Sequence, residues 1–322
     1  MKISVIMATF NGEEVIFSQL ETLKNQSLQP DEVLIFDDAS SDQTVNIITE
    51  FINKNQLASR WHLHCNEQNI GYCNNFRQAA MQAKGDLLFF ADQDDLWRPE
   101  KIEWMAEIMQ NNQEIELLAG QFSSFEGKEP VIKEIPALER RKDQIKQIPF
   151  SQENMYLRSV GCTMAVRRSF MAEIAPFWYD QWAQDEIVWK LSLCRGNGYL
   201  LDYPVIYRRF HEKNTSGKKM HTRCTRMNYL RNLEKSFVYM ARFAEAQACT
   251  DKQLQLIYKN QRMARRRQLV VGKGDLPSAL FLLMKGLSTY HKKRGWLVEL
   301  YLGLRNNEHN KNESFTVCRR KK

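Results

Sequence analysis

The sequence predicts an α/β fold, with a mostly parallel sheet covered by helices on both faces, followed by a helical C-terminal extension. Three observations support this prediction. Over the first hundred residues, short apolar runs alternate with segments of helical period, as in parallel sheets with both faces covered. After about residue 220 the period is helical throughout. The chain has 322 residues, 43% of them hydrophobic, enough for one large domain and an extension.

The expected elements of the sheet begin with an apolar run rich in β-branched residues. In order, we expect a strand over 3–8, a helix over 13–26, a strand over 32–38, a helix over 40–54, a strand over 61–65, a helix over 75–85, a strand over 86–92 and a helix over 98–112. Gly85 marks the end of one helix, and Pro99 suits the first turn of the last one.

The pattern beyond residue 112 is less regular. We expect strands over 115–125 and 157–168, and a helix, a turn and a strand within 184–210. The charged segment 126–150 is interpreted as a mobile excursion. Helices are expected over 222–248, 251–270, 277–289 and 295–304. The predicted organisation is a domain over 1–217, made of halves at about 1–112 and 113–217, and a basic extension over 218–322.

Charge is distributed unevenly along the chain. The net charge is +8, but residues 1–216 carry −9 and residues 217–322 carry +17. Such asymmetry indicates a basic appendage that meets an anionic surface, either membrane or nucleic acid.

Cysteine usage and hydropathy bear on the compartment. The seven cysteines are scattered and form no CxxC pair, which favours reduced thiols in a cytoplasmic protein. The first apolar run is too short for a secretory signal. The longest apolar segment of the tail, 276–284, is too short to span a membrane. We therefore expect a cytoplasmic protein that does not cross a membrane but could lie on one.

Polar stretches follow three of the expected strands: "TFNG" (9–12), "DDASSD" (37–42) and "DQDD" (92–95). Open α/β sheets bind ligands at the carboxyl ends of their strands, so these stretches predict a shared site. The last one places Asp92, Asp94 and Asp95 within four positions, where like charges repel. A hard divalent ion, Mg²⁺ or Mn²⁺, would offset this repulsion and leave positions open for substrate phosphates.

Six segments together resemble a known family. They are "SVIMATFNG", "FDDASSDQT", "NIGYCNNFRQAAMQAKGDLLFFADQDDLWRPEKI", "VGCTMAVRR", "QDEIVW" and "YRRFHEKNTSG". In this order and spacing they resemble family 2 inverting glycosyltransferases with the GT-A fold, a Rossmann-like sheet. Within that family they are most similar to bacterial rhamnosyltransferase-type enzymes of surface polysaccharide synthesis. The resemblance covers about residues 1–217.

The resemblance implies roles for individual residues. The implied nucleotide-sugar-binding residues are Thr9, Phe10, Asn11, Asp38, Asn69, Gly71, Asp92 and Gln93. The implied metal ligands are Asp92, Asp94 and His211. Asp185 falls where the family places its catalytic base. Residues near the acceptor or the diphosphate are Gly161, Cys162, Gln184, Glu186 and Ser216.

Two carboxylates of these segments, Asp185 and Asp95, have simpler interpretations. Asp185 could be a helix-start residue stabilised by the helix dipole, although the resemblance favours the base. Asp95 is interpreted as a loop or cap acid and not as a third metal ligand. Many rhamnosyltransferase-like relatives have His-Asp where this chain has Gln184-Asp185, which leaves the contacts to the acceptor open.

The function implied by the resemblance is sugar transfer from a nucleotide-diphosphate donor to a lipid-linked or polysaccharide acceptor. dTDP-L-rhamnose is the favoured donor, and a UDP-hexose or UDP-N-acetylhexosamine is the alternative. More distant alternatives are a sugar-nucleotide nucleotidyltransferase and a non-enzymatic nucleic-acid binder. The acidic strand-end loops argue against both, because they lack a basic phosphate-gripping loop and would repel a nucleic-acid backbone. We therefore expect no nucleic-acid partner.

The end of the extension carries apolar and aromatic residues beside bases. The stripe comprises Trp296, Leu297, Leu300, Tyr301 and Leu304, next to Lys292, Lys293 and Arg294. This combination suits an anionic membrane surface, in keeping with peripheral association at the inner face of the membrane. Packing of the stripe on the first domain is an equally good interpretation.

Overall fold

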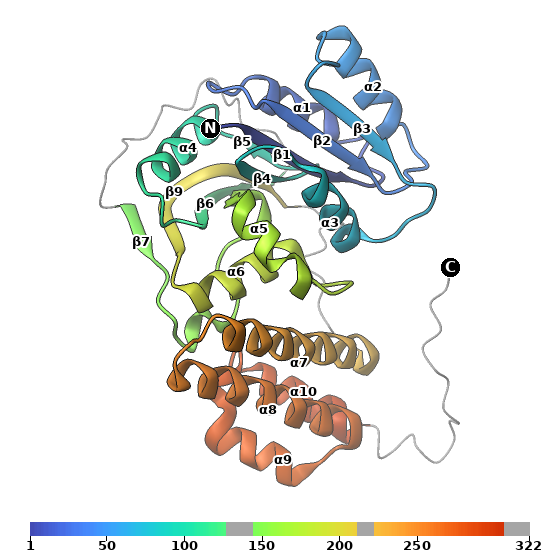
Figure 1. Cartoon of the computed structure of the whole chain (residues 1–322). Helices are drawn as coiled ribbons and strands as arrows, with labels where there is room; N and C mark the ends of the chain where they lie inside the picture. Colours follow the sequence, from blue (N-terminus) through green and yellow to red (C-terminus); the bar gives the residue numbers. More distant parts are fainter. Residues whose placement is uncertain (127–143, 211–221, 306–322) are drawn as a thin grey trace. The chain divides into compact units, whose positions relative to one another are not determined.

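The computed structural model describes residues 1–126, 144–210 and 222–305 (Figure 1). The chain folds as two compact units. The first unit is Met1–Pro149 with Leu157–Lys213, and the second is Phe150–Tyr156 with Asn214–Lys322. A short segment of the acceptor half thus belongs to the unit formed by the C-terminal helices, which its sequence pattern did not indicate. No described helix is both long and apolar enough to cross a membrane.

The first unit is built on one mixed sheet. Its strands are β1 (Ile3–Thr9), β2 (Glu32–Asp37), β3 (Trp61–Cys65), β4 (Leu87–Asp92), β5 (Leu96–Trp97), β6 (Leu117–Phe125), β7 (Ile145–Gln147), β8 (Met164–Arg167) and β9 (Gly198–Arg209). Their order is β3-β2-β1-β4-β8-β6-β9-β5, and β7 also pairs with β9. The first four are parallel, whereas β8 is antiparallel to both its neighbours.

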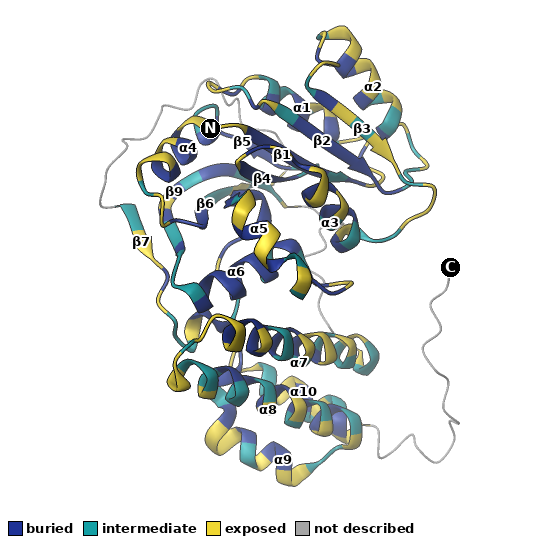
Figure 2. Cartoon of the chain, viewed as in Figure 1, coloured by how far each residue is buried: buried dark blue, intermediate teal, exposed yellow. Residues whose placement is uncertain are grey.

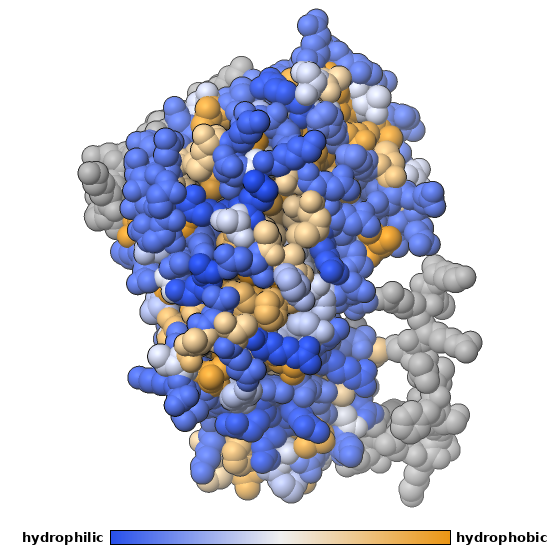
Figure 3. Space-filling model, viewed as in Figure 1, coloured by the Kyte–Doolittle hydropathy of each residue, from blue (hydrophilic) through white to orange (hydrophobic). Residues whose placement is uncertain are grey.

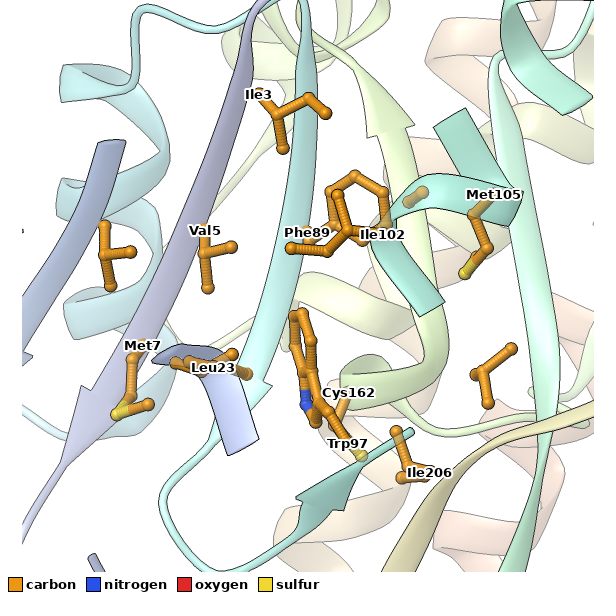
Figure 4. Packing of buried hydrophobic residues seen from close by; sticks show 14 of the residues in the cluster. Ile3, Val5, Met7, Leu23, Phe89, Trp97, Ile102, Met105, Cys162 and Ile206 are labelled. Atoms are coloured by element: carbon orange, nitrogen blue, oxygen red, sulfur yellow. The ribbon is translucent and has the colours of Figure 1, made fainter. Parts of the chain in front are cut away.

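Helices cover both faces of this sheet. They are α1 (Ile16–Lys24), α2 (Thr44–Lys54), α3 (Tyr72–Gln82), α4 (Lys101–Asn111), α5 (Arg168–Ile174) and α6 (Gln184–Arg195). Val5 and Phe89 lie in one core with residues of α1, α2 and α4 (Figure 4). Phe90, the next residue along β4, instead meets Phe76 of α3 edge to face. This alternation places α3 on the opposite face.

The predicted fold class is confirmed. The first eight expected elements all form, with ends shifted by a few residues. The interpretation of 126–150 as an excursion is wrong at its end, because Ile145–Gln147 pair with β9. Residues 127–143 of that segment lie outside the described residues. The short strand β5 and helix α5 were not expected, since neither has a periodic apolar pattern long enough to be recognised.

The second unit contains α7 (Arg223–Ala246), α8 (Asp251–Lys273), α9 (Leu276–Phe281) and α10 (Gly295–Leu304). Thr250 and Gln253 form a capping box at the start of α8, and Gly274, with φ +65°, ends it. Between α9 and α10 the chain forms a π-helical turn, Leu282–Gly286, and a 3₁₀ turn, Leu287–Thr289.

The helices of this unit pack around a small core of their own. Its buried members are Met263, Val270, Ala279, Leu282 and Tyr290, against which Phe281, Trp296 and Leu300 pack. A Cβ added at Gly303 would lie 2.1 Å from the Val270 carbonyl oxygen, so glycine permits α10 to approach α8 closely. The burial pattern is shown in Figure 2.

Candidate active site

The carboxyl ends of β1, β2 and β4 meet at one edge of the sheet. Thr9 pairs with Asp37 across β1 and β2, and Ala8 pairs with Asp92 across β1 and β4. Thr9 Oγ1 donates a 2.8 Å hydrogen bond to Asp37 Oδ2. The three polar stretches predicted to share a site are therefore neighbours, as the parallel register requires.

Gln93 joins the loop after β4 to the loop after β1. Its Oε1 accepts from the Phe10 backbone N–H at 2.9 Å, and its Nε2 donates to the Phe10 carbonyl at 3.1 Å. A Cβ at Gly12 would lie only 2.5 Å from Gln93 Oε1, so glycine is needed for this contact. Gln93, which was predicted to bind nucleotide, fixes with its amide the backbone of Phe10, whose side chain is 45% exposed.

Asn11 connects the loops after β1 and β2. Its φ is +46°, a left-handed conformation that asparagine tolerates better than most residues. Asn11 Oδ1 accepts from the Ser41 backbone N–H at 2.9 Å, and its own N–H donates to Ser40 Oγ at 2.9 Å. Asn11, which was predicted to lie near the nucleotide, thus links the loop after β1 to the loop after β2.

Asp38 is buried and organises the loop before α3. Its carboxylate accepts from the backbone N–H groups of Ile70 and Gly71, both at 2.8 Å, and from Asn66 Nδ2 at 3.0 Å. Gly71 has a φ of +84°, which favours glycine, and it directly precedes α3. The predicted pocket residues Asp38 and Gly71 are therefore in contact, and the exposed Asn69 lies in the loop that they hold.

The carboxylates after β4 form a partly buried cluster. Oxygen atoms of Asp92 and Asp95 and the sulfur of Cys162 lie within 4.8 Å of one another. Burial raises the pKa of Asp92 to about 6, with a further contribution from the charge of Asp94. Burial raises the pKa of Asp95 to about 8, with contributions from the charges of Asp92 and Asp94.

Asp95 has a larger part in this cluster than its sequence context suggested. It is 1% exposed, and its carboxylate accepts from the Arg209 backbone N–H at 3.3 Å, as a loop acid would. Its other oxygen, Oδ2, is buried and accepts no hydrogen bond within the described residues. A buried, unpaired carboxylate oxygen beside a second carboxylate fits a divalent cation.

The predicted metal ligands are not all brought together. Asp92 belongs to the cluster, whereas Asp94 is not among the three residues whose ligand atoms lie within 4.8 Å of one another. His211 and Ser216 lie outside the described residues. The oxygen donors present suit Mg²⁺ or Mn²⁺, but the sulfur of Cys162 is a soft ligand that these ions do not favour.

Three basic residues near the cluster were not among the predicted site residues. The charge of Arg208 lowers the pKa values of Asp92 and Asp95 against the larger effect of burial. Arg209 Nε donates to the Asp94 carbonyl oxygen at 3.2 Å. Lys101 is buried, its Nζ lies 3.0 Å from the centre of the Trp97 ring, and it donates to the Cys162 carbonyl oxygen at 2.5 Å. The two arginines end β9, and a basic pair at a strand end was a signal that could have identified them.

Asp185 lies in the first turn of α6, within electrostatic range of Asp92. Burial raises its pKa to about 7, and the negative charges of Glu186 and Asp92 make smaller contributions in the same direction. Its Oδ1 accepts from the Glu186 backbone N–H at 2.7 Å. An acid held only by the helix dipole should have a lowered pKa, so burial and neighbouring charge outweigh the dipole here.

Gly161 allows α6 to approach the loop before β8. A Cβ at Gly161 would lie 2.9 Å from Gln184 Nε2 and 3.3 Å from the Cβ of Asp185. Gln184 is 4% exposed, and its Oε1 accepts no hydrogen bond within the described residues. Glu186 instead pairs with the buried Lys190 at 2.6 Å. Gly161 and Gln184, predicted to lie near the acceptor, are therefore neighbours of Asp185, the predicted base.

The model of glycosyl transferase family 2 matches residues 4–174, more than half of the chain. The chain belongs to glycosyl transferase family 2. The matched residues lie in the first unit apart from Phe150–Tyr156, and the chain is a glycosyltransferase.

Among curated relatives, one similar protein is the UDP-Glc:alpha-D-GlcNAc-diphosphoundecaprenol beta-1,3-glucosyltransferase WfgD of Escherichia coli. It is 32% identical over 110 residues, which are 34% of this chain and 42% of that protein. The match thus spans less than half the length of this relative.

Two solved structures show the same fold. TarS residues 1–349 from Staphylococcus aureus, in complex with UDP-GlcNAc, align with a TM-score of 0.63 at 16% identity, covering 97% of this chain and 92% of that one. The mannosyltransferase PcManGT from Pyrobaculum calidifontis, with GDP-Man and Mn²⁺, aligns with a TM-score of 0.51 at 16% identity, covering 97% and 88%.

Proposed function

We propose that the protein is an inverting glycosyltransferase that moves a sugar from a nucleotide-diphosphate donor to a hydroxyl of a lipid-linked or polysaccharide glycan. The observation that carries this proposal is the placement of Asp185. It is a partly buried carboxylate with a pKa of about 7, and the charge of Asp92 at the acidic strand end contributes to that value. A group with this pKa is suited to accept a proton near neutral pH.

Asp185 acts as the general base. It takes the proton from the acceptor hydroxyl while that oxygen forms a bond to the anomeric carbon of the donor. The bond from this carbon to the diphosphate oxygen breaks, and the nucleoside diphosphate leaves. One displacement inverts the anomeric configuration, so a single base on the acceptor side is sufficient. The hydrogen bond from the Glu186 N–H fixes one oxygen of Asp185, and the other remains for the acceptor.

The strand-end loops bind the donor. Asp38 and Gly71 keep the loop over 66–71 in place to form a wall of the nucleotide pocket. Phe10, which directly follows β1 and whose backbone is held by Gln93, offers an exposed ring to the donor. Arg208 places positive charge near Asp92, where the donor diphosphate would lie.

Asp92 and Asp95 would hold Mg²⁺ or Mn²⁺, with Asp94 as a further candidate ligand. When bound, such an ion would neutralise the charge that develops on the leaving diphosphate. The complex of PcManGT with Mn²⁺ supports this part of the proposal.

Loss of metal should therefore abolish transfer. EDTA should stop the reaction, and added Mn²⁺ should restore it in the wild type. Asp92→Asn should also lose Mn²⁺ binding in calorimetry, whereas Glu67→Gln, an exposed residue outside the cluster, should keep it. Undiminished transfer in EDTA would contradict the metal site.

A UDP-linked hexose or N-acetylhexosamine is the proposed donor. The names of WfgD and of the TarS complex specify UDP-Glc and UDP-GlcNAc. The sequence favoured dTDP-L-rhamnose, which none of the three relatives described above uses by name, so this donor remains a prediction. A screen of UDP-Glc, UDP-Gal, UDP-GlcNAc and dTDP-L-rhamnose, with release of nucleoside diphosphate as the readout, decides between them.

The proposed acceptor is a glycan on a lipid carrier, and the proposed place of action is the cytoplasmic face of a membrane. The name of WfgD specifies an acceptor linked to diphosphoundecaprenol. The six described cysteines are free, in keeping with a reducing compartment. Transfer to a diphosphate-linked lipid acceptor and absence of transfer to the free sugar would support this assignment.

A further inference from the structure

Large apolar side chains are exposed on α9, on α10 and on the π-helical turn Leu282–Gly286 that follows α9. We call these eight residues the apolar face: Leu276, Leu280, Leu283, Met284, Leu297, Val298, Tyr301 and Leu304. Each is between 41% and 72% exposed. Figure 2 shows exposed residues along α9, and Figure 3 shows hydrophobic residues at the lower end of this unit. Such a concentration of apolar side chains usually marks an interaction surface.

The apolar face is separate from the side of α10 that packs. Trp296 belongs to the core of the second unit, and its Nε1 donates to the Ala279 carbonyl at 2.9 Å, which joins α10 to α9. Glu299 is fully buried, and Gly303 lies against α8. These contacts fix the rotation of α10 about its axis. Leu297 and Tyr301 therefore lie on its exposed side. The stripe expected from the sequence is divided, since Trp296 and Leu300 pack inside.

The α9 side of the apolar face has the same organisation. Ser278, Ala279 and Leu282 are buried, whereas Leu276, Leu280 and Leu283 follow at helical spacing on the exposed side. Leucines of a soluble helix rarely face water in such a row. Both helices thus have one apolar side that packs and a second that does not.

Exposed cations accompany the apolar face. They are Lys285, Lys292, Lys293, Arg294 and Arg305. The acid between residues 276 and 305 is Glu299, which is buried and paired with Arg226 and Arg267. Residues 276–305 therefore contain no exposed acid that would repel an anionic surface. Apolar and aromatic side chains beside clustered bases are the combination that interfacial helices use on anionic lipids.

We propose that the apolar face docks on an anionic lipid bilayer, with the leucines and Tyr301 at the level of the headgroups. A second copy of the chain is a poor occupant, because its own lysines and arginines would meet the same cations. A bilayer of anionic lipids offers an apolar interior for the apolar side chains and negative headgroups for the cations. The inference deepens the proposed function, because it would bring the enzyme to a surface that holds lipid-linked acceptors.

Flotation of the full chain with vesicles tests this inference. We expect the protein to float with vesicles of phosphatidylcholine and phosphatidylglycerol, and much less with phosphatidylcholine alone. Leu280→Ser with Met284→Ser, and separately Leu297→Ser with Tyr301→Ser, should lower the partition coefficient at least about tenfold. Lys292→Gln with Lys293→Gln should lower it by roughly 10- to 30-fold.

Matched variants act as controls. Leu28→Ser with Met81→Ser removes two exposed apolar side chains from the first unit, and Arg265→Gln removes an exposed cation on α8. Both should float like the wild type. Circular dichroism of each variant confirms folding.

Two outcomes would overturn the docking inference. One is equal flotation of the wild type and the apolar-face variants. The other is absence of flotation together with a dimer, in gel filtration, that Leu297→Ser with Tyr301→Ser dissociates. Donor hydrolysis measured in the absence of vesicles keeps the two proposals separate. Hydrolysis without vesicle binding contradicts only the docking surface, and vesicle binding without hydrolysis or transfer contradicts only the proposed function.

Discussion

The pKa of Asp185 links a single side chain to the chemistry. The carboxyl is surrounded by Glu186 on its own helix, by Asp92 of β4, and by Tyr72 and Cys73 of α3, whose own pKa values its charge raises. The largest contributions to its pKa are burial and the charges of Glu186 and Asp92, and the base Lys190 on the same helix pairs with Glu186. Burial and like charge therefore both favour the protonated acid.

This environment predicts the pH dependence of transfer. Asp185 acts only when ionised, so turnover should be low below its pKa of about 7 and should rise to a plateau above it. The measurement is turnover at saturating donor and acceptor over a pH series. A profile that is flat through neutral pH would mean that the titration of Asp185 does not limit the reaction.

Gly161→Ala should impair turnover without unfolding the protein. The added methyl group would come within 3.3 Å of the Cβ of Asp185 and 2.9 Å of Gln184 Nε2, so both side chains must move. Displacement of a catalytic group by about 1 Å can cost up to about 100-fold in rate. We expect a 10- to 100-fold lower kcat, by the same argument, with a nearly unchanged Kd for the donor.

Gly272→Ala is the matched control for this substitution. A Cβ at Gly272 would meet the Met227 side chain at 3.5 Å, an ordinary contact, so activity should be unchanged. If Gly161→Ala also kept full activity, the close approach of α6 to this loop would have no role in positioning the base.

Among the elements of the second unit, one buried carboxylate joins three helices. Glu299 of α10 pairs with Arg226 of α7 at 2.6 Å and with Arg267 of α8 at 2.8 Å. It also accepts a 2.8 Å hydrogen bond from the Tyr290 hydroxyl. Both oxygens of Glu299 thus have partners. Because these partners lie outside α10, they fix α10 in the rotation that exposes the apolar face.

Glu299→Gln should strongly destabilise this unit. The amide leaves the buried Arg267 and the partly buried Arg226 without this counter-charge, and the loss of one member of a buried ion pair costs about 3–5 kcal/mol. Thermal unfolding followed by circular dichroism measures the effect. Glu245→Gln, whose exposed carboxylate accepts from the Tyr258 hydroxyl, should change stability little. Equal melting of the two variants would show that the network adds no stability.

The periodicity of apolar residues and the polar stretches at strand ends were sufficient to predict most of the helices and strands. The alternation of strand and helix up to residue 112 placed the carboxyl ends of β1, β2 and β4 together, because parallel register leaves little choice. The short strand β5 and the helix α5 could not be predicted in this way. β7 could not either, because its three residues gain their partner, β9, from far along the chain.

The side-chain contacts of the site were less predictable. Asp38 and Gln93 were expected to contact the nucleotide, and the structure gives them backbone partners that no local pattern reveals. Asp95 was interpreted as a loop acid, and its unpaired oxygen depends on how deeply it is buried. The rotation of α10 was also open, since an apolar helix with two apolar sides does not itself reveal which side packs.

On the scale of the whole molecule, the two units divide the charge and the proposed work. The acidic part of the chain carries the strand-end carboxylates and the candidate base. The basic part, residues 217–322, carries the apolar face and a net charge of +17. This division is consistent with an enzyme that binds a metal and a donor in one unit and a membrane surface with the other.

Asp185→Asn tests the central claim most directly. The amide keeps the shape of the side chain but cannot accept a proton at neutral pH. Turnover at saturating donor should fall by roughly two to four orders of magnitude, the usual contribution of a general base. Donor affinity measured by calorimetry should stay near that of the wild type. Asp38→Asn should have the opposite effect, weakening donor binding by loosening the loop over 66–71. An Asp185→Asn enzyme with turnover within a few-fold of wild type would contradict the assignment of Asp185 as the base.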